Sequence, residues 1–182
     1  FFKANDLYPR PDEFMDRAAS LGAAFNATTR EELVSYYLTV VADSVEGGMQ
    51  FLDAALRGAQ FRGDELRREK VVVLGEYDRA ESSPWFRLDA RIGHELWGSF
   101  WSRKNTIGDR TVIADVTPEQ MRTIRDLYYV PNNSALIVAG DVDPERIFAS
   151  AERTFGDWPR GEDPFKRSPI PQVEPIQGSR GV

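Results

Sequence analysis

The stretch that decides the fold is DELRREKVVVLGEYDRA, residues 64–80. Strong helix formers stand at both ends of it, and acidic residues occupy what would be the first helical turn. The central VVVLG, residues 71–75, would by itself indicate a short buried strand, because it is β-branched and ends in glycine. The flanking residues favour a helix, so we predict one helix whose apolar middle is buried.

Two glutamates share one face of this predicted helix. Glu69 and Glu76 stand seven residues apart. Val72 and Val73 lie between them at helical spacing, so all four side chains fall on a single stripe. Carboxylates on an apolar stripe are costly to bury without a positive or hydrogen-bonding partner. The spacing leaves open whether that partner is a metal ion, a catalytic proton or an arginine, or whether both groups are partly solvated.

Composition indicates an ordinary soluble domain. The chain has 182 residues, of which 41% are hydrophobic and 29% charged, and this is enough for a hydrophobic core. A formal net charge of −6 argues against nucleic acid or an anionic membrane as a partner. No apolar run approaches membrane-spanning length, and no secretion signal opens the chain. We expect a soluble protein, and the sequence does not decide between periplasm and cytoplasm.

The chain offers few residues for metal or thiol chemistry. It contains no cysteine and one histidine, His94. Thiolate nucleophiles and thiolate metal sites are therefore excluded. A catalytic zinc ion usually takes two or more nitrogen or sulfur ligands, and this chain cannot supply them alone. His94 lies in a helical pattern beside tryptophans, where a packing or surface role is the more common one.

Helical and strand patterns alternate along the rest of the chain. Two early strand patterns differ: the first is polar enough for a sheet edge, and the second is apolar enough for a sheet centre. A later apolar run after a Pro-Asn-Asn turn predicts a buried strand. Together they predict an α+β fold with helices packed on one mainly antiparallel sheet. The predicted helices cover residues 12–21, 43–59, 64–80, 85–97, 118–128 and 144–154. The predicted strands cover residues 24–30, 33–41 and 134–140, and a predicted loop covers residues 98–116.

Proline becomes frequent near the end of the chain. Positions 159, 164, 169, 171 and 175 are all proline. This spacing is typical of an extended linker, so we interpret residues 1–158 as a partial domain and residues 159–182 as a linker toward a second domain. The chain also opens on Phe1 without a methionine. We therefore interpret it as an N-terminally truncated piece of a longer protein.

Three long segments carry a resemblance to a known family: LGAAFNATTREELVSYYLTV (21–40), ELRREKVVVLGEYDRAESSP (65–84) and TIGDRTVIADVTPEQMRTIRDLYYVPNNSALIVAGDVDPE (106–145). In this order they resemble the N-terminal metal-binding domain of the M16 peptidases, the pitrilysin, insulysin and mitochondrial-processing-peptidase group. That family carries an inverted zinc motif, H-x-x-E-H, and a glutamate further along as the third ligand. The resemblance assigns this third ligand to Glu76 and a supporting role to Glu69. It places both histidines and the general base upstream of Phe1, so no catalytic residue is expected within the chain.

The resemblance also implies a cofactor, a substrate site and a partner. The cofactor is zinc, which polarises the scissile carbonyl while the motif glutamate activates water. A peptide or protein substrate is expected along the edge strand at Phe25, Asn26, Ala27 and Thr28. A second M16-type domain or subunit is expected to close over the site. The isolated chain is then expected to bind no stoichiometric zinc and to cleave no peptide.

Two other interpretations stay open. The main alternative is a non-catalytic M16-like subunit that binds peptides or scaffolds an assembly without metal. Retention of both Glu69 and Glu76 argues against it, since such a subunit need not keep two carboxylates on an apolar stripe. The weaker alternative is an unrelated binding domain. A truncated M16 domain would also lack the first strands of its sheet. The remaining sheet edge is then expected either to be exposed or to pair with a second copy of the chain in a homo-oligomer.

Overall fold

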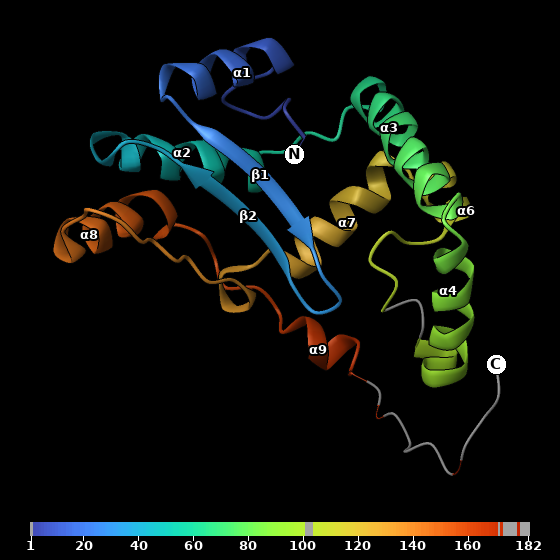
Figure 1. Cartoon of the computed structure of the whole chain (residues 1–182). Helices are drawn as coiled ribbons and strands as arrows, with labels where there is room; N and C mark the ends of the chain where they lie inside the picture. The colour runs from blue at the N-terminus through green and yellow to red at the C-terminus, as the bar shows by residue number, and fades with distance from the viewer. Residues whose placement is uncertain (1, 101–103, 171, 173–177, 179–182) are drawn as a thin grey trace.

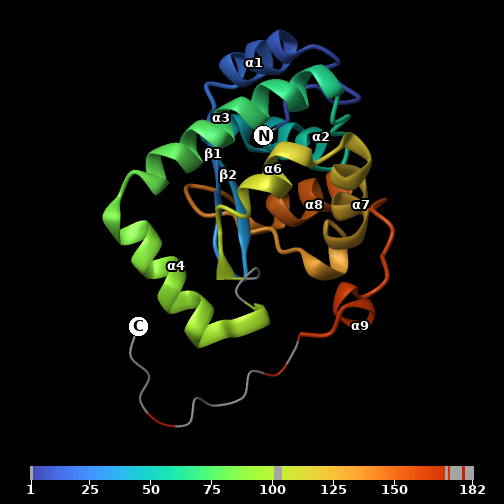
Figure 2. The ribbon, with the colours of Figure 1, turned by 90° about the vertical axis from the view of Figure 1, so that its right-hand side faces the viewer.

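Helices pack on one face of a β-hairpin, and two further helices, residues 63–81 and 84–97, extend away from it as an arm (Figures 1 and 2). The computed structural model describes residues 2–100, 104–170, 172 and 178. None of the helices in these ranges is long and apolar enough to cross a membrane. The elements are α1 (Pro11–Ser20), β1 (Ala24–Thr29), β2 (Val34–Thr39), α2 (Val45–Leu56), α3 (Gly63–Glu81), α4 (Pro84–Trp97), α6 (Arg110–Asp115), α7 (Pro118–Tyr128), α8 (Pro144–Phe155) and α9 (Pro164–Arg167), with 3₁₀ turns at Ala42–Ser44, Gly98–Phe100 and Pro131–Asn133.

The chain turns sharply from α1 into the hairpin at a glycine. Gly22 has φ +61°, a left-handed conformation that costs glycine little and other residues more. The Gly22 amide donates to the Ala19 carbonyl at 3.0 Å, and the Ala23 amide to the Ala18 carbonyl at 2.9 Å. These bonds close the helix as glycine C-caps commonly do. They deliver the chain directly into β1, which pairs antiparallel with β2.

An aromatic cluster joins α1, α2 and the hairpin. Phe14 and Phe51 are fully buried, with ring centroids 4.2 Å apart. Phe25 of β1 meets Phe14 edge to face at 5.7 Å. Leu38, opposite Phe25 on β2, also packs against this cluster. The helices therefore cover the face of the hairpin that carries Phe25, and the predicted α+β class is confirmed.

The predicted capping signals are mostly present. Thr117 accepts a hydrogen bond from the Gln120 amide at 3.3 Å, and the Gln120 side chain accepts one from the Thr117 amide at 2.8 Å. This reciprocal pair begins α7 as predicted. Asp143 begins α8 by accepting from the Arg146 amide at 3.0 Å. Ser83, the predicted cap of α4, makes no such side-chain bond, and Pro84 alone opens that helix.

A charged contact ties α8 to α2. The Arg153 guanidinium lies 2.9 Å from the Glu46 carboxylate, and the Ser150 hydroxyl donates to the same group at 3.3 Å. The hydrogen bond from Arg153 holds the pKa of Glu46 below its usual range. The ion pair links two helices about a hundred residues apart in sequence.

This contact predicts a pH-dependent contribution to stability. Because folding lowers the pKa of Glu46, the contact stabilises the fold above the pKa of the unfolded chain and loses that effect as pH falls through the folded value. We expect Arg153→Ala to lower the urea midpoint near neutral pH and to match the parent chain at about pH 2–3. Urea titrations of both chains across pH test this. A difference that persists undiminished at low pH would contradict it.

Helices α4 and α6 both contact α3 beside the hairpin (Figure 2). The Lys70 ammonium of α3 donates to the Ala114 carbonyl of α6 at 2.7 Å. Arg110 of α6 pairs with Asp78 of α3, and its guanidinium lies over the Tyr77 ring. One side of α3 therefore contacts α4 and α6, and the opposite side of α3 contacts neither of these helices.

Three sequence expectations fail here. Residues 134–139 are extended but unpaired, with Leu136 45% and Ile137 87% exposed, so the predicted buried strand is wrong. β2 is not central, because the sheet in the described residues has two strands. A strand needs neighbours for its backbone bonds, and none of the elements described here supplies them. The predicted loop at 98–116 contains α6, which Asp109 caps; residues 101–103 of that loop lie outside the described residues.

The segment after α8 returns to the body of the chain. The Gly161 amide donates to the Asn132 side chain at 2.9 Å, and Pro164 is buried. Asp163 then caps the short helix α9. The first part of the predicted linker therefore packs against the fold. Most of the remainder, from residue 171 on, lies outside the described residues.

Candidate functional site

The two glutamates of the predicted stripe lie on one face of α3. The helix is uninterrupted from Gly63 to Glu81, so Glu69 and Glu76 stand two turns apart on the same side. Glu76 is exposed and Glu69 is half-buried. Neither forms an ion pair with any residue that the structure describes, and Arg68 and Arg110 pair with Asp64 and Asp78 of the same helix instead. This face is open to a ligand or to a partner segment.

Two valines in the middle of α3 are exposed, contrary to the expectation of a buried apolar middle, while Val73 and Leu74 are half-buried. Val71 is 71% and Val72 55% exposed. The helix buries its other side instead, where the Tyr77 ring meets the Phe86 ring of α4 edge to face at 5.4 Å. Periodicity correctly predicts which residues share a stripe. It cannot predict which stripe finds a partner, because that depends on elements distant in sequence.

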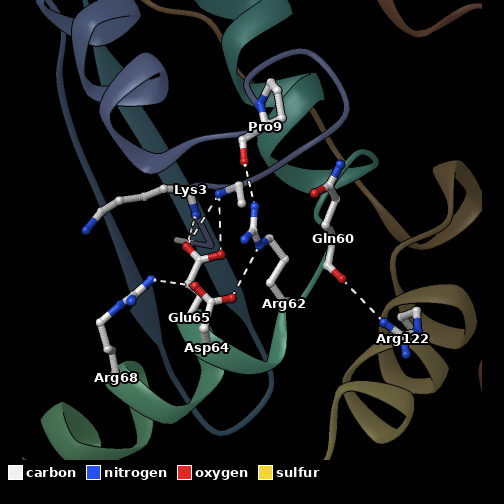
Figure 3. A network of polar contacts seen from close by, with 9 residues as sticks. Lys3, Pro9, Gln60, Arg62, Asp64, Glu65, Arg68 and Arg122 are labelled. Atoms are coloured by element: carbon white, nitrogen blue, oxygen red, sulfur yellow. Dashed lines mark hydrogen bonds and ion pairs between the residues drawn. The ribbon is translucent and has the colours of Figure 1, made fainter.

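A third carboxylate of α3 has a buried role that the sequence analysis missed. Glu65 is 2% exposed and accepts hydrogen bonds from the Lys3 amide at 2.6 Å and the Ala4 amide at 3.4 Å (Figure 3). Glu65 lies one turn before Glu69, on the same face of the helix. The bonds therefore fix residues 3 and 4 at the N-terminal end of the glutamate stripe. Helix-dipole reasoning explains an acidic first turn but does not indicate so distant a partner.

Further polar contacts hold the start of α3 in place (Figure 3). The Arg62 guanidinium donates to the Pro9 carbonyl at 3.2 Å. Arg122 of α7 donates to the Gln60 carbonyl at 3.3 Å. Two separate segments, the one before α1 and helix α7, thereby meet the chain just ahead of α3. The beginning of the glutamate helix is anchored, whereas its exposed face is left open.

The backbone groups at the open edge of β1 follow from the hairpin register. The Arg30 amide donates to the Leu33 carbonyl at 2.8 Å, which makes these two residues a hydrogen-bonded pair. Hydrogen-bonded and non-bonded pairs alternate along an antiparallel ladder. The even-numbered residues of β1 therefore direct their amides to β2. The odd-numbered residues Phe25, Ala27 and Thr29 direct theirs to the open edge.

The four predicted substrate-binding residues consequently differ in what they present. Phe25 and Ala27 offer backbone N–H and C=O groups outward, while the backbones of Asn26 and Thr28 bond to β2. The Phe25 side chain packs in the aromatic cluster. The Asn26 and Thr28 side chains are exposed on the uncovered face of the hairpin. One strand thus combines a half-buried aromatic anchor, an edge of outward-facing backbone groups and an exposed polar face.

A pair of tyrosines holds β2 against α7. The Tyr36 and Tyr129 hydroxyl oxygens are 2.8 Å apart, and burial raises the pKa of Tyr36 well above its usual range. A cavity of about 150 Å³ lies beside them, lined mainly by apolar side chains such as Phe61 and Met121. The Tyr36 hydroxyl therefore stays protonated near neutral pH. The contact positions the hairpin on its supporting helix.

The described residues do not make a complete zinc site. Among them, no three His, Cys, Asp or Glu side chains lie close enough together to hold one metal ion. Glu76 has the carboxylate oxygens that zinc accepts, but a zinc site normally needs three protein ligands. His94 is on α4 and is exposed. Zinc therefore does not fit the described residues alone, and they support no catalytic step through a metal.

Comparisons with known proteins identify the family. The family model described as Insulinase (Peptidase family M16) matches residues 1–99, and the one described as Peptidase M16 inactive domain matches residues 115–181. The chain belongs to peptidase family M16. An uncharacterized zinc protease of Rickettsia felis is 28% identical over 146 residues, which cover 78% of this chain and 34% of that protein. The probable zinc protease PqqL of Escherichia coli is 26% identical over 151 residues, 81% of this chain and 16% of that protein.

Solved structures share the fold. The periplasmic protease PqqL from Escherichia coli matches with a TM-score of 0.78 at 22% identity, over 97% of this chain and 20% of that one. A peptidase M16 inactive domain from Pseudomonas fluorescens matches with a TM-score of 0.79 at 17% identity, over 95% of this chain and 41% of that one. The chain spans about a third or less of the length of the Rickettsia felis and Escherichia coli zinc proteases.

Proposed function

We propose that the whole protein is a zinc-dependent metalloendopeptidase in which Glu76 is a zinc ligand and Glu69 supports it. The observation that carries this proposal is the open face of α3, where both carboxylates lie unpaired within the described residues and inside the segment matched by the insulinase family model. In this proposal two histidine ligands and the general base precede Phe1. The 182-residue chain by itself cleaves no peptide.

Peptide substrate is proposed to add as a strand along the open edge of β1. The outward amides and carbonyls of Phe25, Ala27 and Thr29 supply the main-chain partners for an extended peptide. The half-buried Phe25 ring packs against the aromatic cluster and anchors this strand to the core. The exposed side chain of Thr28 lies next to the path of the peptide and contacts it from one face, and the exposed side chain of Asn26 lies beside the same path.

A second M16-type domain or subunit is the proposed partner that completes the enzyme. The modest share of each relative that this chain covers supports it. We also propose residues 1–158 as the partial peptidase domain and residues 159–182 as the connection to that partner. Val71 and Val72, exposed on α3, offer apolar surface for it. Self-association of two copies is the competing use of the same surface.

A non-catalytic role is the second candidate. The model for the M16 inactive domain matches residues 115–181, and the inactive domain from Pseudomonas fluorescens shares the fold. Such a subunit would bind peptide at the β1 edge or scaffold a peptidase without holding zinc. The five or so residues encoded just before Phe1 distinguish the two candidate functions. The motif H-x-x-E-H at that place supports the peptidase, and its absence supports the non-catalytic subunit.

Metal analysis of the whole protein tests the first candidate. We expect Glu76→Gln to abolish stoichiometric zinc and to reduce peptide cleavage by at least about 100-fold. Glu69→Gln should weaken zinc binding by roughly 10–100-fold, as loss of a supporting group does. Glu81→Gln, at the end of the same helix, is the matched control and should change neither. Zinc content by mass spectrometry and cleavage of a fluorogenic peptide are the measurements.

Three results would each contradict part of the proposal. Full zinc content and cleavage in the Glu76→Gln protein would show that the ligand lies elsewhere. A parent protein that holds no zinc and cleaves nothing, yet binds peptide, would establish the non-catalytic role instead. A zinc ion bound tightly by the 182-residue chain alone would contradict the placement of the missing ligands.

A further inference from the structure

The outward N–H in the middle of the β1 edge is already occupied. The Ala27 amide donates to the Asn26 side-chain carbonyl at 2.8 Å. The register shows that this amide points away from β2, so the bond uses no donor that the hairpin needs. Asn26 itself is exposed, and its own backbone amide faces β2. Its side chain therefore bends along the edge and covers the next N–H.

We propose that the Asn26 carboxamide is a reversible cap on the open edge of β1. The cap occupies the group that an incoming strand would need at the centre of its pairing with β1. It deepens the proposed strand addition of peptide and, for its effect on peptide, rests on that proposal. The cap itself is a property of the free chain and exists whether or not peptide is the natural ligand.

Edge strands give a physical reason for such a cap. A free row of N–H and C=O groups is a template for pairing with any extended chain, and proteins protect such rows by local devices. Ala27 is the middle one of three outward-facing residues, so covering its N–H interrupts the row where pairing would be strongest. A peptide that pairs with β1 replaces the carboxamide with its own carbonyl. Exchange of one hydrogen bond for another changes affinity only modestly.

Amide hydrogen exchange on the free chain tests the cap directly. Asn26→Ala removes the acceptor, and we expect the Ala27 amide to exchange roughly tenfold faster. Asn26→Asp keeps a side-chain oxygen that accepts a charge-assisted bond, and should preserve the protection. Thr28→Ala, exposed on the same face of the same strand, is the matched control and should leave Ala27 unchanged. Nuclear magnetic resonance resolves the individual amide.

Peptide binding tests the consequence. The probe is a short fluorescein-labelled peptide of alternating valine and threonine with lysine at both ends, chosen because the chain is acidic. Fluorescence anisotropy should show binding about two- to tenfold tighter for Asn26→Ala than for the parent chain. The Asn26→Asp chain should bind no tighter than the parent. Thr39→Ala, an exposed position on β2 with no assigned contact to peptide, is the control for binding and should bind like the parent.

The outcomes separate the cap from the proposed function. Unchanged exchange of Ala27 in the Asn26→Ala chain would overturn the cap. Weaker peptide binding by that variant would also overturn it, since the carboxamide would then be a contact to peptide. Faster exchange of Ala27 with no peptide bound by any variant would support the cap and overturn strand addition on β1.

Discussion

Replacing Phe51 with alanine is expected to lower the free energy of unfolding by about 3–5 kcal/mol. The ring is fully buried and meets Phe14 at 4.2 Å and Phe25 at 5.4 Å between centroids. Truncation leaves a cavity at the point where α1, α2 and β1 join, and these elements cannot close it without moving the hairpin. Urea denaturation followed by circular dichroism measures the loss.

The matched control is Phe148 on α8, which is 74% exposed. Phe148→Ala removes the same side chain from a surface position and should change stability by no more than about 0.5 kcal/mol. Equal losses for Phe148→Ala and Phe51→Ala would show that the aromatic cluster is not the core of the fold.

Replacing Glu65 with alanine is expected to cost about 2–4 kcal/mol, the second large effect. The substitution leaves the Lys3 and Ala4 amides without their acceptor. Ala4 is fully buried, so water cannot replace the lost partner at its amide without local opening. A buried donor left unpaired carries the full cost of its desolvation. Urea denaturation gives the total loss, and hydrogen exchange at the Ala4 amide locates it.

Two further variants separate the acceptor role of Glu65 from its charge. Glu65→Gln keeps an oxygen in the same place and should lose only part of the stability that Glu65→Ala loses. Glu69→Ala changes a half-exposed carboxylate of the same helix face and should have a small effect. Full protection of the Ala4 amide in the Glu65→Ala chain would contradict the role assigned to this carboxylate.

Local patterns predicted the elements that depend on neighbours in sequence. The helix at residues 64–80 corresponds to α3, and the Thr117–Gln120 capping box begins α7. The two early strands form the β1–β2 hairpin. In each case the deciding interaction joins residues close together in the chain: helix propensity, a cap three residues away, or a two-residue loop. Such interactions are visible in the sequence.

Expectations failed where the deciding partner is distant. Val72 falls on the predicted stripe, but nothing in its own helix determines what covers it. The run that contains Ile137 has the composition of a buried strand, yet the described residues give it no neighbour. Glu65 was missed because its partners, Lys3 and Ala4, are more than sixty residues away. Such long-range contacts produce no periodic pattern in the amino-acid sequence.

The candidate site was predictable only in part. Spacing placed Glu69 and Glu76 on one face but left their chemistry open, and the resemblance to the M16 peptidases supplied the zinc assignment. The polarity of β1 indicated an edge. The alternation that separates Phe25 and Ala27 from Asn26 and Thr28 needed the register at Arg30, which a sequence pattern does not fix.

The bond between Glu65 and Lys3 also constrains the order of folding. It spans 62 residues, whereas α3 itself needs only local contacts. Closing so long a loop has an entropic cost that grows slowly with length and is recovered only once α3 exists. The opening residues should therefore dock late, after the rate-limiting step. Interactions formed after that step govern the rate of unfolding rather than the rate of folding. We therefore expect loss of the Glu65 contact mainly to speed unfolding.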